Sequence, residues 1–464
     1  MLRDRSAPVD LFALVPALQL RFEPELAELD RLLEDDQIFR QVKADLSRRR
    51  PHTTETGRPS TPVEVILRLL VVQHLYDWSY AQTEQFVGDS LVLRQFCRLG
   101  FQPVPHHTTL MRWSNLLQPE TMHRLLDRVT DMARSLKVTR GRKLRIDSTV
   151  VATAIHYPTD STLLFDSVRV LGRLARQAAT ALCGTARRLG ARRTRLAKHL
   201  VRRVEATAAV GATAGMRAER PKLYRRLLTV TQASIDQAHH IQHWLTGWSD
   251  PAAQRLESAI KHTLPLVQKM IAQAERRVLQ GETVPASEKL VSLFEPHTAI
   301  VRRGKAHLPA EFGRKIVLDE VDGGLITRYA VLVGNPPDAP ELPTSLTQHQ
   351  MRFGRAPTVL TADRAFFTLA NDQLAHDLRI RSIALPRQGP LTTTQHQVQH
   401  RAAFRRAYRW RAGIEGRISV LKRRFGLARC RYRGEAGMER WVGWGLLAHN
   451  LRQISRSVVA ESAG

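Results

Sequence analysis

One carboxylate, Glu415, lies in a segment otherwise rich in arginine and lysine, AYRWRAGIEGRISVLKRRFG. Apolar residues recur there at helical spacing and predict a helix with one face toward a core; they are Ile414, Ile418, Leu421 and Phe425. Four further side chains share an adjoining arc of this helix and would point into one site: Tyr408, Arg411, Glu415 and Lys422.

Two interpretations of Glu415 follow from this pattern. In the first, the acid lies on a solvated helix face and relieves the repulsion between neighbouring cations. In the second, it binds a metal ion beside cations that hold a phosphate group. The second interpretation requires partner acids elsewhere in the chain.

Asp147 and Asp363 are the candidate partners. Asp147 interrupts a segment that favours a strand, KLRIDSTVVA, and an acid in a strand is costly unless it faces solvent or a ligand. An exposed-face aspartate is therefore the alternative there. Asp363 ends an apolar strand, APTVLTAD, just before a predicted helix, which is a favoured site position in α/β sheets. Asp322 precedes Gly323-Gly324 and predicts a hairpin turn instead.

The composition of the chain indicates which class of molecule it binds. Its 464 residues are 43% hydrophobic, which allows two or three domains with cores, and the formal net charge is +28. So large a positive charge points to a polyanion, nucleic acid above all. Three scattered cysteines give neither a disulfide framework nor a zinc motif, and no apolar run is long enough for a membrane span or signal peptide. We therefore expect a cytoplasmic protein without a membrane partner.

Residues 1–137 are expected to form an all-helical N-terminal domain. Thr61, Pro62 and Glu64 resemble a capping box at the start of its central helix. A helix-turn-helix that binds DNA and a helical dimerisation module both fit this pattern. His106 and His107 are interpreted as turn residues, because no further ligands lie at metal-binding spacing in the sequence.

The rest of the chain predicts an α/β domain of five strands, residues 138–165 and 286–452, interrupted by a helical insertion, residues 166–285. KLVSLFEP (289–296) is one of the candidate strands, and residues 453–464 are expected to be a C-terminal tail. The insertion carries eleven Lys and Arg between Arg169 and Arg203. So one-sided a charge favours contact with phosphates over a solvated face, and the candidates are Arg187, Arg188, Arg192 and Arg193.

The spacing Tyr408-x2-Arg411-x3-Glu415-x6-Lys422 matches the Y-R-E-K signature of one branch of the DDE transposases of bacterial insertion sequences. Further segments resemble the ISNCY-type group of these enzymes: IDSTVV, YPTDS, SLFEPHTAIVRRGK, EFGRK, ADRAFF, RAGIEGRISVLKR and ERWVGWGLLAHNL. The likeness extends over most of residues 61–452. It implies a ribonuclease-H-like catalytic domain, a mixed sheet of five strands with flanking helices.

The resemblance further implies that Asp147, Asp363 and Glu415 bind two Mg²⁺ ions, with Mn²⁺ as a substitute. Arg411, Lys422 and Tyr408 would hold the terminal nucleotides of the element. The implied partners are double-stranded DNA, both element ends and target, and a second copy of the chain in a DNA-bound homodimer, in the bacterial nucleoid. Two alternatives stay open: a ribonuclease-H-like nuclease that cuts without joining, and an inactive relative that binds DNA as a repressor.

Overall fold

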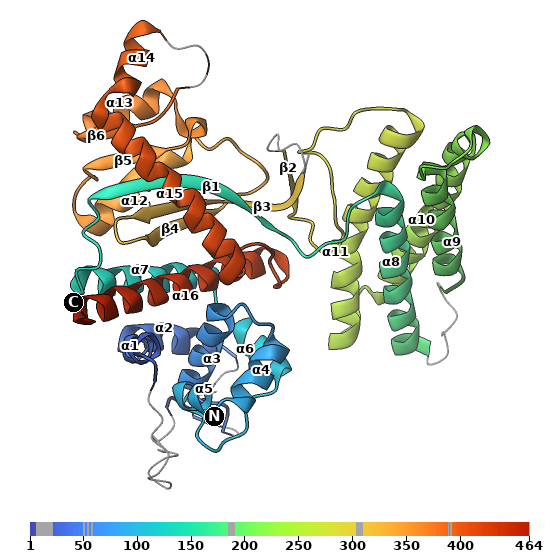
Figure 1. The fold of residues 1–464 in the computed structure, drawn as a ribbon. Coiled ribbons are helices and arrows are strands. Elements are labelled where there is room, and N and C mark those ends of the chain that lie inside the picture. The colour runs from blue at the N-terminus through green and yellow to red at the C-terminus, as the bar shows by residue number, and fades with distance from the viewer. Residues whose placement is uncertain are drawn as a thin grey trace. The chain divides into compact units, whose positions relative to one another are not determined.

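The computed structural model of the protein describes residues 1–5, 22–49, 59–183, 191–302, 310–387 and 392–463, together with His52, Glu55, Thr56 and Gly389. The chain forms two compact units. The first combines Met1–Ala152 with Arg314–Gly464, and the second is Thr153–Gly313 (Figure 1). Within these described ranges, no helix is long and apolar enough to cross a membrane.

The first unit begins with helices, as the sequence predicts. They are α1 Pro24–Leu32, α2 Asp36–Ser47, α3 Val63–Leu75, α4 Tyr80–Asp89, α5 Leu91–Phe96, α6 His107–Ser114 and α7 Pro119–Ser135. The expected capping box at Thr61 is wrong, because α3 begins at Val63 and its cap residue, Pro62, makes no side-chain hydrogen bond. Glu64 instead lies 3.1 Å from Nε of the fully buried Arg68. A buried guanidinium without a carboxylate partner costs more free energy than a missing helix cap, so Glu64 pairs with Arg68.

The sheet of the first unit is mixed, as expected. Its strands are β1 Lys143–Ala152, β3 Glu311–Val321, β4 Leu325–Val331, β5 Val359–Ala362 and β6 Ser382–Ala384. They are ordered β3-β1-β5-β6, and β4 pairs with β3. β5 runs parallel to β1 and to β6, whereas β3 and β4 form the antiparallel hairpin predicted around Asp322.

Helices flank this sheet: α12 Glu341–Phe353, α13 Leu369–Asp377, α14 Thr393–His400, α15 Ala402–Arg424 and α16 Gly434–Ala463, with a short 3-10 turn at Arg364–Phe366. α15 contacts β1, β5 and β6. Its predicted core face is confirmed, since Ile414, Leu421 and the C-cap residue Phe425 are buried and Ile418 packs half-buried against the core. Residues 453–463, expected to be a tail, are the last turns of α16 instead.

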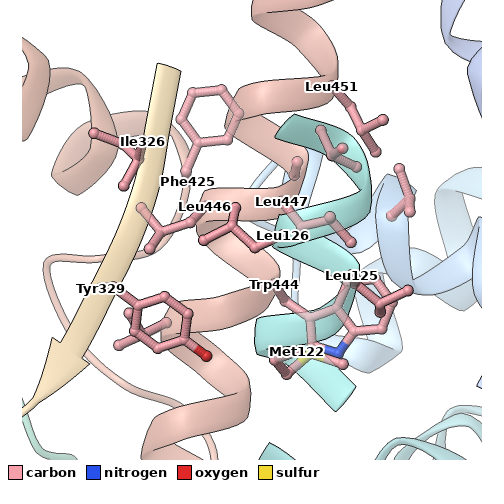
Figure 2. Packing of buried hydrophobic residues seen from close by; sticks show 14 of the residues in the cluster. Met122, Leu125, Leu126, Ile326, Tyr329, Phe425, Trp444, Leu446, Leu447 and Leu451 are labelled. Carbon is pink, nitrogen blue, oxygen red and sulfur yellow. The ribbon is translucent and has the colours of Figure 1, made fainter. Parts of the chain in front are cut away.

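α16 links the N-terminal helices to the sheet. It packs against α1, α3 and α7, and also against β4. Figure 2 shows Trp444 and Leu447 of α16 beside Leu125 of α7, and Leu446 beside Ile326 and Tyr329 of β4. All of these side chains belong to one buried cluster. The N-terminal helices, expected to form a domain of their own, therefore share a hydrophobic core with the sheet.

A buried ion cluster fixes α15 against the sheet. Glu320 of β3 has a side chain with 0% exposure, and it accepts hydrogen bonds from Nε and Nη2 of Arg145 on β1, at 2.9 and 2.5 Å. Arg417 of α15 donates to the same carboxylate at 3.2 Å. Arg145 also donates to the backbone carbonyl of Trp410 on α15. Three elements therefore converge on one carboxylate.

The cluster continues into α16 through His449. Nη1 of Arg417 lies 3.2 Å from Nε2 of His449, and Nδ1 of His449 lies 3.0 Å from the amide oxygen of Asn450. Asn450 in turn bonds both backbone groups of Ile326 on β4. Burial, aided by the charge of Arg417, lowers the pKa of His449 to about 3. The neutral ring therefore accepts from Arg417 and donates from Nδ1.

A side chain from β1 approaches the backbone of α15 closely at Gly413. A Cβ atom built there would lie 2.5 Å from Nη1 of Arg145, a distance that real Cβ contacts do not show. The group that approaches is therefore the Arg145 side chain. Gly416 has no such neighbour within 4 Å.

The second unit is largely helical, as expected of the insertion. Its elements are α8 Asp160–Cys183, α9 Ala191–Ala208, α10 Ala214–Leu245, α11 Pro251–Ala274, a π-helical turn at Glu275–Leu279, and β2 Ala299–Val301, which pairs with Glu311–Gly313 of β3. The strand expected at 289–296 is absent from these described residues. Ser292 Oγ there accepts from the backbone N–H groups of Phe294 and Glu295, at 3.1 Å each, and makes a turn.

The ion cluster predicts a large stability effect. Glu320→Ala should lower the free energy of unfolding by about 3–5 kcal/mol, because it leaves two largely buried guanidinium groups without their carboxylate. Chemical denaturation of the full chain measures this loss.

Glu25→Ala is the matched control. Glu25 also contacts two arginines, Arg452 and Arg456, but its side chain is 39% exposed. Its loss should cost less than about 1 kcal/mol. Equal losses in the two variants would contradict the role given to Glu320.

Candidate active site

Asp147 and Asp363 come from adjacent parallel strands. Ile146 of β1 is in register with Ala362, the last residue of β5, so Asp147 and Asp363 directly follow this pair in the chain. The backbone N–H of Ser148 donates to Asp147 at 2.7 Å, and that of Arg364 donates to Asp363 at 2.8 Å. Strand pairing therefore sets the two carboxylates side by side at the end of the β1–β5 ladder.

Glu415 approaches the same place from α15. The helix contacts β1 and β5, and its buried Ile414 lies next to Glu415 in the sequence. The side-chain exposure rises from 14% at Asp147 to 42% at Asp363 and 66% at Glu415. The three acids thus extend from the edge of the core to solvent, where a large substrate can reach them.

Arg411 joins the three acids. Its Nη1 atom lies 3.8 Å from Asp147 and 4.0 Å from Asp363, and its Nη2 atom donates to Glu415 at 3.2 Å. The sequence predicts that Arg411 shares an arc with Glu415, and the structure confirms it. The sequence does not predict that the guanidinium contacts all three carboxylates.

The electrostatics of Arg411 follow from this placement. Burial alone would lower its pKa, but the negative charges around it, led by Asp363, raise the pKa of Arg411 above its ordinary value. The guanidinium is therefore firmly cationic. Its Nε atom is buried and has no hydrogen-bond partner among the described residues. A group that must stay charged but is incompletely bonded can gain from a further acceptor, such as a phosphate oxygen.

Tyr408 and Lys422 lie on the same helix as Arg411. The Arg411 guanidinium carbon is 5.1 Å from the centre of the Tyr408 ring, a cation–π distance, and Tyr408 as a whole is 40% exposed. Lys422 is half-buried and follows Glu415 by seven residues, or about two turns. Tyr408 thus lies against the guanidinium and is itself partly exposed to solvent.

A second polar cluster supports β1 beside Asp147, and sequence reasoning missed it. Ser148 Oγ lies 3.2 Å from Asp338, and Lys315 of β3 contacts the same carboxylate at 2.7 Å. Lys315 also donates to the carbonyl of Pro336 at 2.8 Å. A lysine within the apolar strand KIVLDEV was the available signal, because a buried ammonium needs a carboxylate.

The remaining acids of β3 and its turn have structural partners. Asp322 accepts from the backbone N–H groups of Arg140 and Lys143, at 2.9 and 3.0 Å, which confirms its turn role. Asp319 is buried and accepts from Ser345 at 2.9 Å. Burial raises the pKa of Asp319 to about 6.

The arginines predicted to contact DNA in the insertion fall in two groups. Arg187 and Arg188 lie outside the described residues. On α9, Arg192 is exposed, whereas Arg193 donates to the side-chain amide of Gln237. Exposed cations continue along α9 at Arg195, Lys198 and Arg202, opposite its buried Ala197, Leu200 and Val204.

The donor chemistry of Asp147, Asp363 and Glu415 suits Mg²⁺, which prefers carboxylate oxygens and water. All three carboxylates lie within 4.0 Å of the Arg411 guanidinium. Within the described part of the chain, however, their oxygens are not all gathered within 4.8 Å of one another; the cluster that meets this distance is Glu84, His106 and His107. The triad is therefore held apart around Arg411.

Comparison with known proteins identifies two domains. Residues 16–116 match the family described as a transposase domain, DUF772, and residues 310–451 match the transposase DDE domain. The second match contains Asp363 and Glu415, and Asp147 lies before it on the paired strand. The mixed sheet with flanking helices is the ribonuclease-H-like architecture of DDE domains.

A curated relative is known only as an uncharacterized protein, ORF8 in the nfe locus of Rhizobium meliloti. It is 26% identical over 129 residues, which are 26% of this chain and 61% of the relative. No solved structure matches the chain. The chain thus contains a DUF772 transposase domain within residues 16–116 and, within residues 310–451, a transposase DDE domain, a domain of the catalytic phosphoryl-transfer class.

Proposed function

We propose that this protein binds the DNA ends of an insertion sequence, cuts them at the site formed by Asp147, Asp363 and Glu415, and joins the freed 3′-OH ends to target DNA. The observation that carries this proposal is the contact of one guanidinium, Arg411, with all three carboxylates. It brings together acids that are separated by up to 268 positions in the chain (415 − 147). A solvated helix face would not account for this convergence.

Two Mg²⁺ ions, or Mn²⁺ in their place, supply an activated water and a stabilised leaving oxygen when bound to such a triad. The pairing of β1 with β5 supports this role for Asp147 and Asp363, and the contacts of α15 with both strands support it for Glu415. Water adds to the phosphorus at the element end, the bond to the 3′ oxygen breaks, and a 3′-OH remains. In the joining step that hydroxyl displaces the 3′ oxygen of a target phosphodiester, so both steps use one site.

Arg411, Tyr408 and Lys422 position the DNA end in this proposal. Arg411 exchanges the carboxylates for a phosphate, which it can grip with two parallel hydrogen bonds. Tyr408 holds the guanidinium plane by its cation–π contact. Lys422 adds a point charge farther along α15.

The remaining DNA contacts are assigned by charge and placement. The N-terminal helices carry the DUF772 match and are the candidates for end recognition or for pairing two copies of the chain on DNA. The exposed cations of α9 are the candidates for phosphate contacts in the second unit. The ISNCY-type motifs make that group of bacterial elements, acting on DNA in the nucleoid, the proposed setting.

The triad proposal is tested with isosteric variants. Asp147→Asn, Asp363→Asn and Glu415→Gln should each reduce cleavage by roughly 10³-fold or more, because each removes a charged ligand of a unit that acts together. Binding to end DNA should persist. The measurement is single-turnover cleavage of pre-bound DNA carrying the inverted repeats that flank the gene.

Asp372→Asn is the control, since Asp372 lies nine residues after Asp363 on α13 and pairs with Arg387 at 3.5 Å. It should cut at the parent rate. A triad variant that also cuts at the parent rate would remove that residue from the site. If the parent protein produces cut ends but no joined products, the alternative of a nuclease that cuts without joining would be favoured.

A second prediction concerns the exchange at Arg411. Arg411→Gln should bind Mg²⁺ about tenfold or more tightly in the absence of DNA, since a charge-assisted hydrogen bond to the acids no longer competes. Calorimetric titration measures this. Arg409→Gln removes an equal charge from an exposed position on the same helix and should change the affinity little. Equal effects of the two variants on the Mg²⁺ affinity would show that Arg411 acts only through its positive charge.

A third prediction distinguishes the paired hydrogen bonds of the Arg411 guanidinium from its positive charge. Arg411→Lys keeps the charge but loses the two parallel N–H donors, so it should lower the rate of cleavage or joining by about 10²-fold through misplacement of the DNA end. Lys422→Arg should be milder. Both are compared at saturating protein, with folding checked separately. Parent rates in Arg411→Lys would show that the fork geometry is not needed.

A further inference from the structure

The N-terminal helices hold a cluster of metal-ligating side chains away from the triad. Glu84 lies on α4, and His106 and His107 lie at the start of α6, which packs against α4 (Figure 1). One potential ligand atom from each residue lies within 4.8 Å of the others. The sequence alone predicts that both histidines are turn residues, because no further ligand lies at metal-binding spacing. Folding supplies that ligand from a position more than twenty residues earlier.

The contacts within the cluster suit a metal ion. Nδ1 of His107 lies 2.7 Å from Oε2 of Glu84, the spacing of a shared proton. A tetrahedral ion bound to both atoms would need them roughly 3.4 Å apart, given ligand distances near 2.1 Å, so a small opening of this pair suffices. The His106 ring centre lies 4.0 Å from that of His107. Nδ1 of His106 lies 2.8 Å from Thr108 Oγ1, the outer hydrogen bond that orients a ligating imidazole.

Helix capping alone does not explain these residue types. His106 does cap α6, because Nδ1 accepts from the backbone N–H of Thr108 at 3.4 Å. Ligation through Nε2 would need the other tautomer, in which Nδ1 carries the proton and donates to Thr108 Oγ1. Serine, threonine, aspartate or asparagine would cap better. Glu84 accepts from the backbone N–H of His107 at 2.8 Å, and this hydrogen bond, with the nearby imidazoles, lowers the pKa of the Glu84 carboxyl. The carboxylate is thus anionic and ready to bind a cation.

We propose that Glu84, His106 and His107 bind one Zn²⁺ ion, or a similar borderline divalent ion, that joins α4 to α6. Two imidazoles and one carboxylate are a donor set of zinc, whereas Mg²⁺ prefers oxygen ligands. The side chains of Glu84 and His107 are 31% and 41% exposed, so a fourth position is open to water. This site and the acid triad would therefore take different metals.

Zinc titration of the full chain tests the site. The protein is prepared without a histidine tag, stripped with a chelator, and titrated with Zn²⁺ by calorimetry in excess Mg²⁺, which occupies oxygen-rich sites. The parent should bind one more Zn²⁺ ion than the double variant His106→Ala, His107→Ala. Zn²⁺ should also raise the unfolding temperature of the parent more than that of this variant.

Two further variants make the result specific. His239→Ala with His240→Ala removes another adjacent pair of exposed histidines, on α10, and should keep the parent stoichiometry. Glu84→Gln can still accept from the backbone of His107, so it should fold normally yet bind Zn²⁺ at least about tenfold more weakly. Co²⁺ bound to the parent should give the visible absorption of a tetrahedral nitrogen and oxygen site, lost in Glu84→Gln.

The same stoichiometry and affinity in the parent, His106→Ala with His107→Ala, and Glu84→Gln would overturn the proposal. So would an equal loss of Zn²⁺ binding in the control pair. No DNA enters the experiment, so its outcome is independent of cleavage and joining at the triad.

Discussion

The position of α15 on the sheet depends on one buried carboxylate. Glu320 is bonded by Arg145 from β1 and by Arg417 from α15, and Arg145 also reaches the backbone of α15 at Trp410. Since Arg411 lies six residues before Arg417 on the same helix, this cluster also sets where Arg411 meets the acids. A buried ion pair is a poor source of stability but enforces one arrangement when all its hydrogen bonds are made. The geometry of the site thus depends on a carboxylate outside it.

The local patterns of the sequence predicted much of this arrangement. Asp147 in a strand, Asp363 at a strand end and Glu415 on an amphipathic helix are candidates from the sequence, because a carboxylate among apolar residues is costly unless it binds something. The turn residues Asp322-Gly323-Gly324 likewise predict the hairpin. The role of Glu320 is not predictable in this way, although it also lies in an apolar strand, because its partners Arg145 and Arg417 are brought together only by folding.

The errors have the same origin. The sequence around Thr61 fits a capping box, but in the structure Glu64 pairs with Arg68. The burial of Arg68, which creates this pairing, cannot be predicted from the neighbouring residues alone. His106 and His107 lacked a ligand at close sequence spacing and gained Glu84 in space. The sequence predicts that Arg411 contacts a phosphate, and in the structure without DNA it contacts the acids that would bind metal. Its incomplete bonding and its charge suit a residue that changes partners between these two states.

The exchange of Arg411 is the central claim, and diffraction can observe it. Crystals of the protein with end DNA and Mn²⁺ should show anomalous scattering peaks bound by Asp147, Asp363 and Glu415, with the Arg411 guanidinium moved onto a DNA phosphate. Manganese bound elsewhere, while Arg411 still contacts the three carboxylates, would contradict the account.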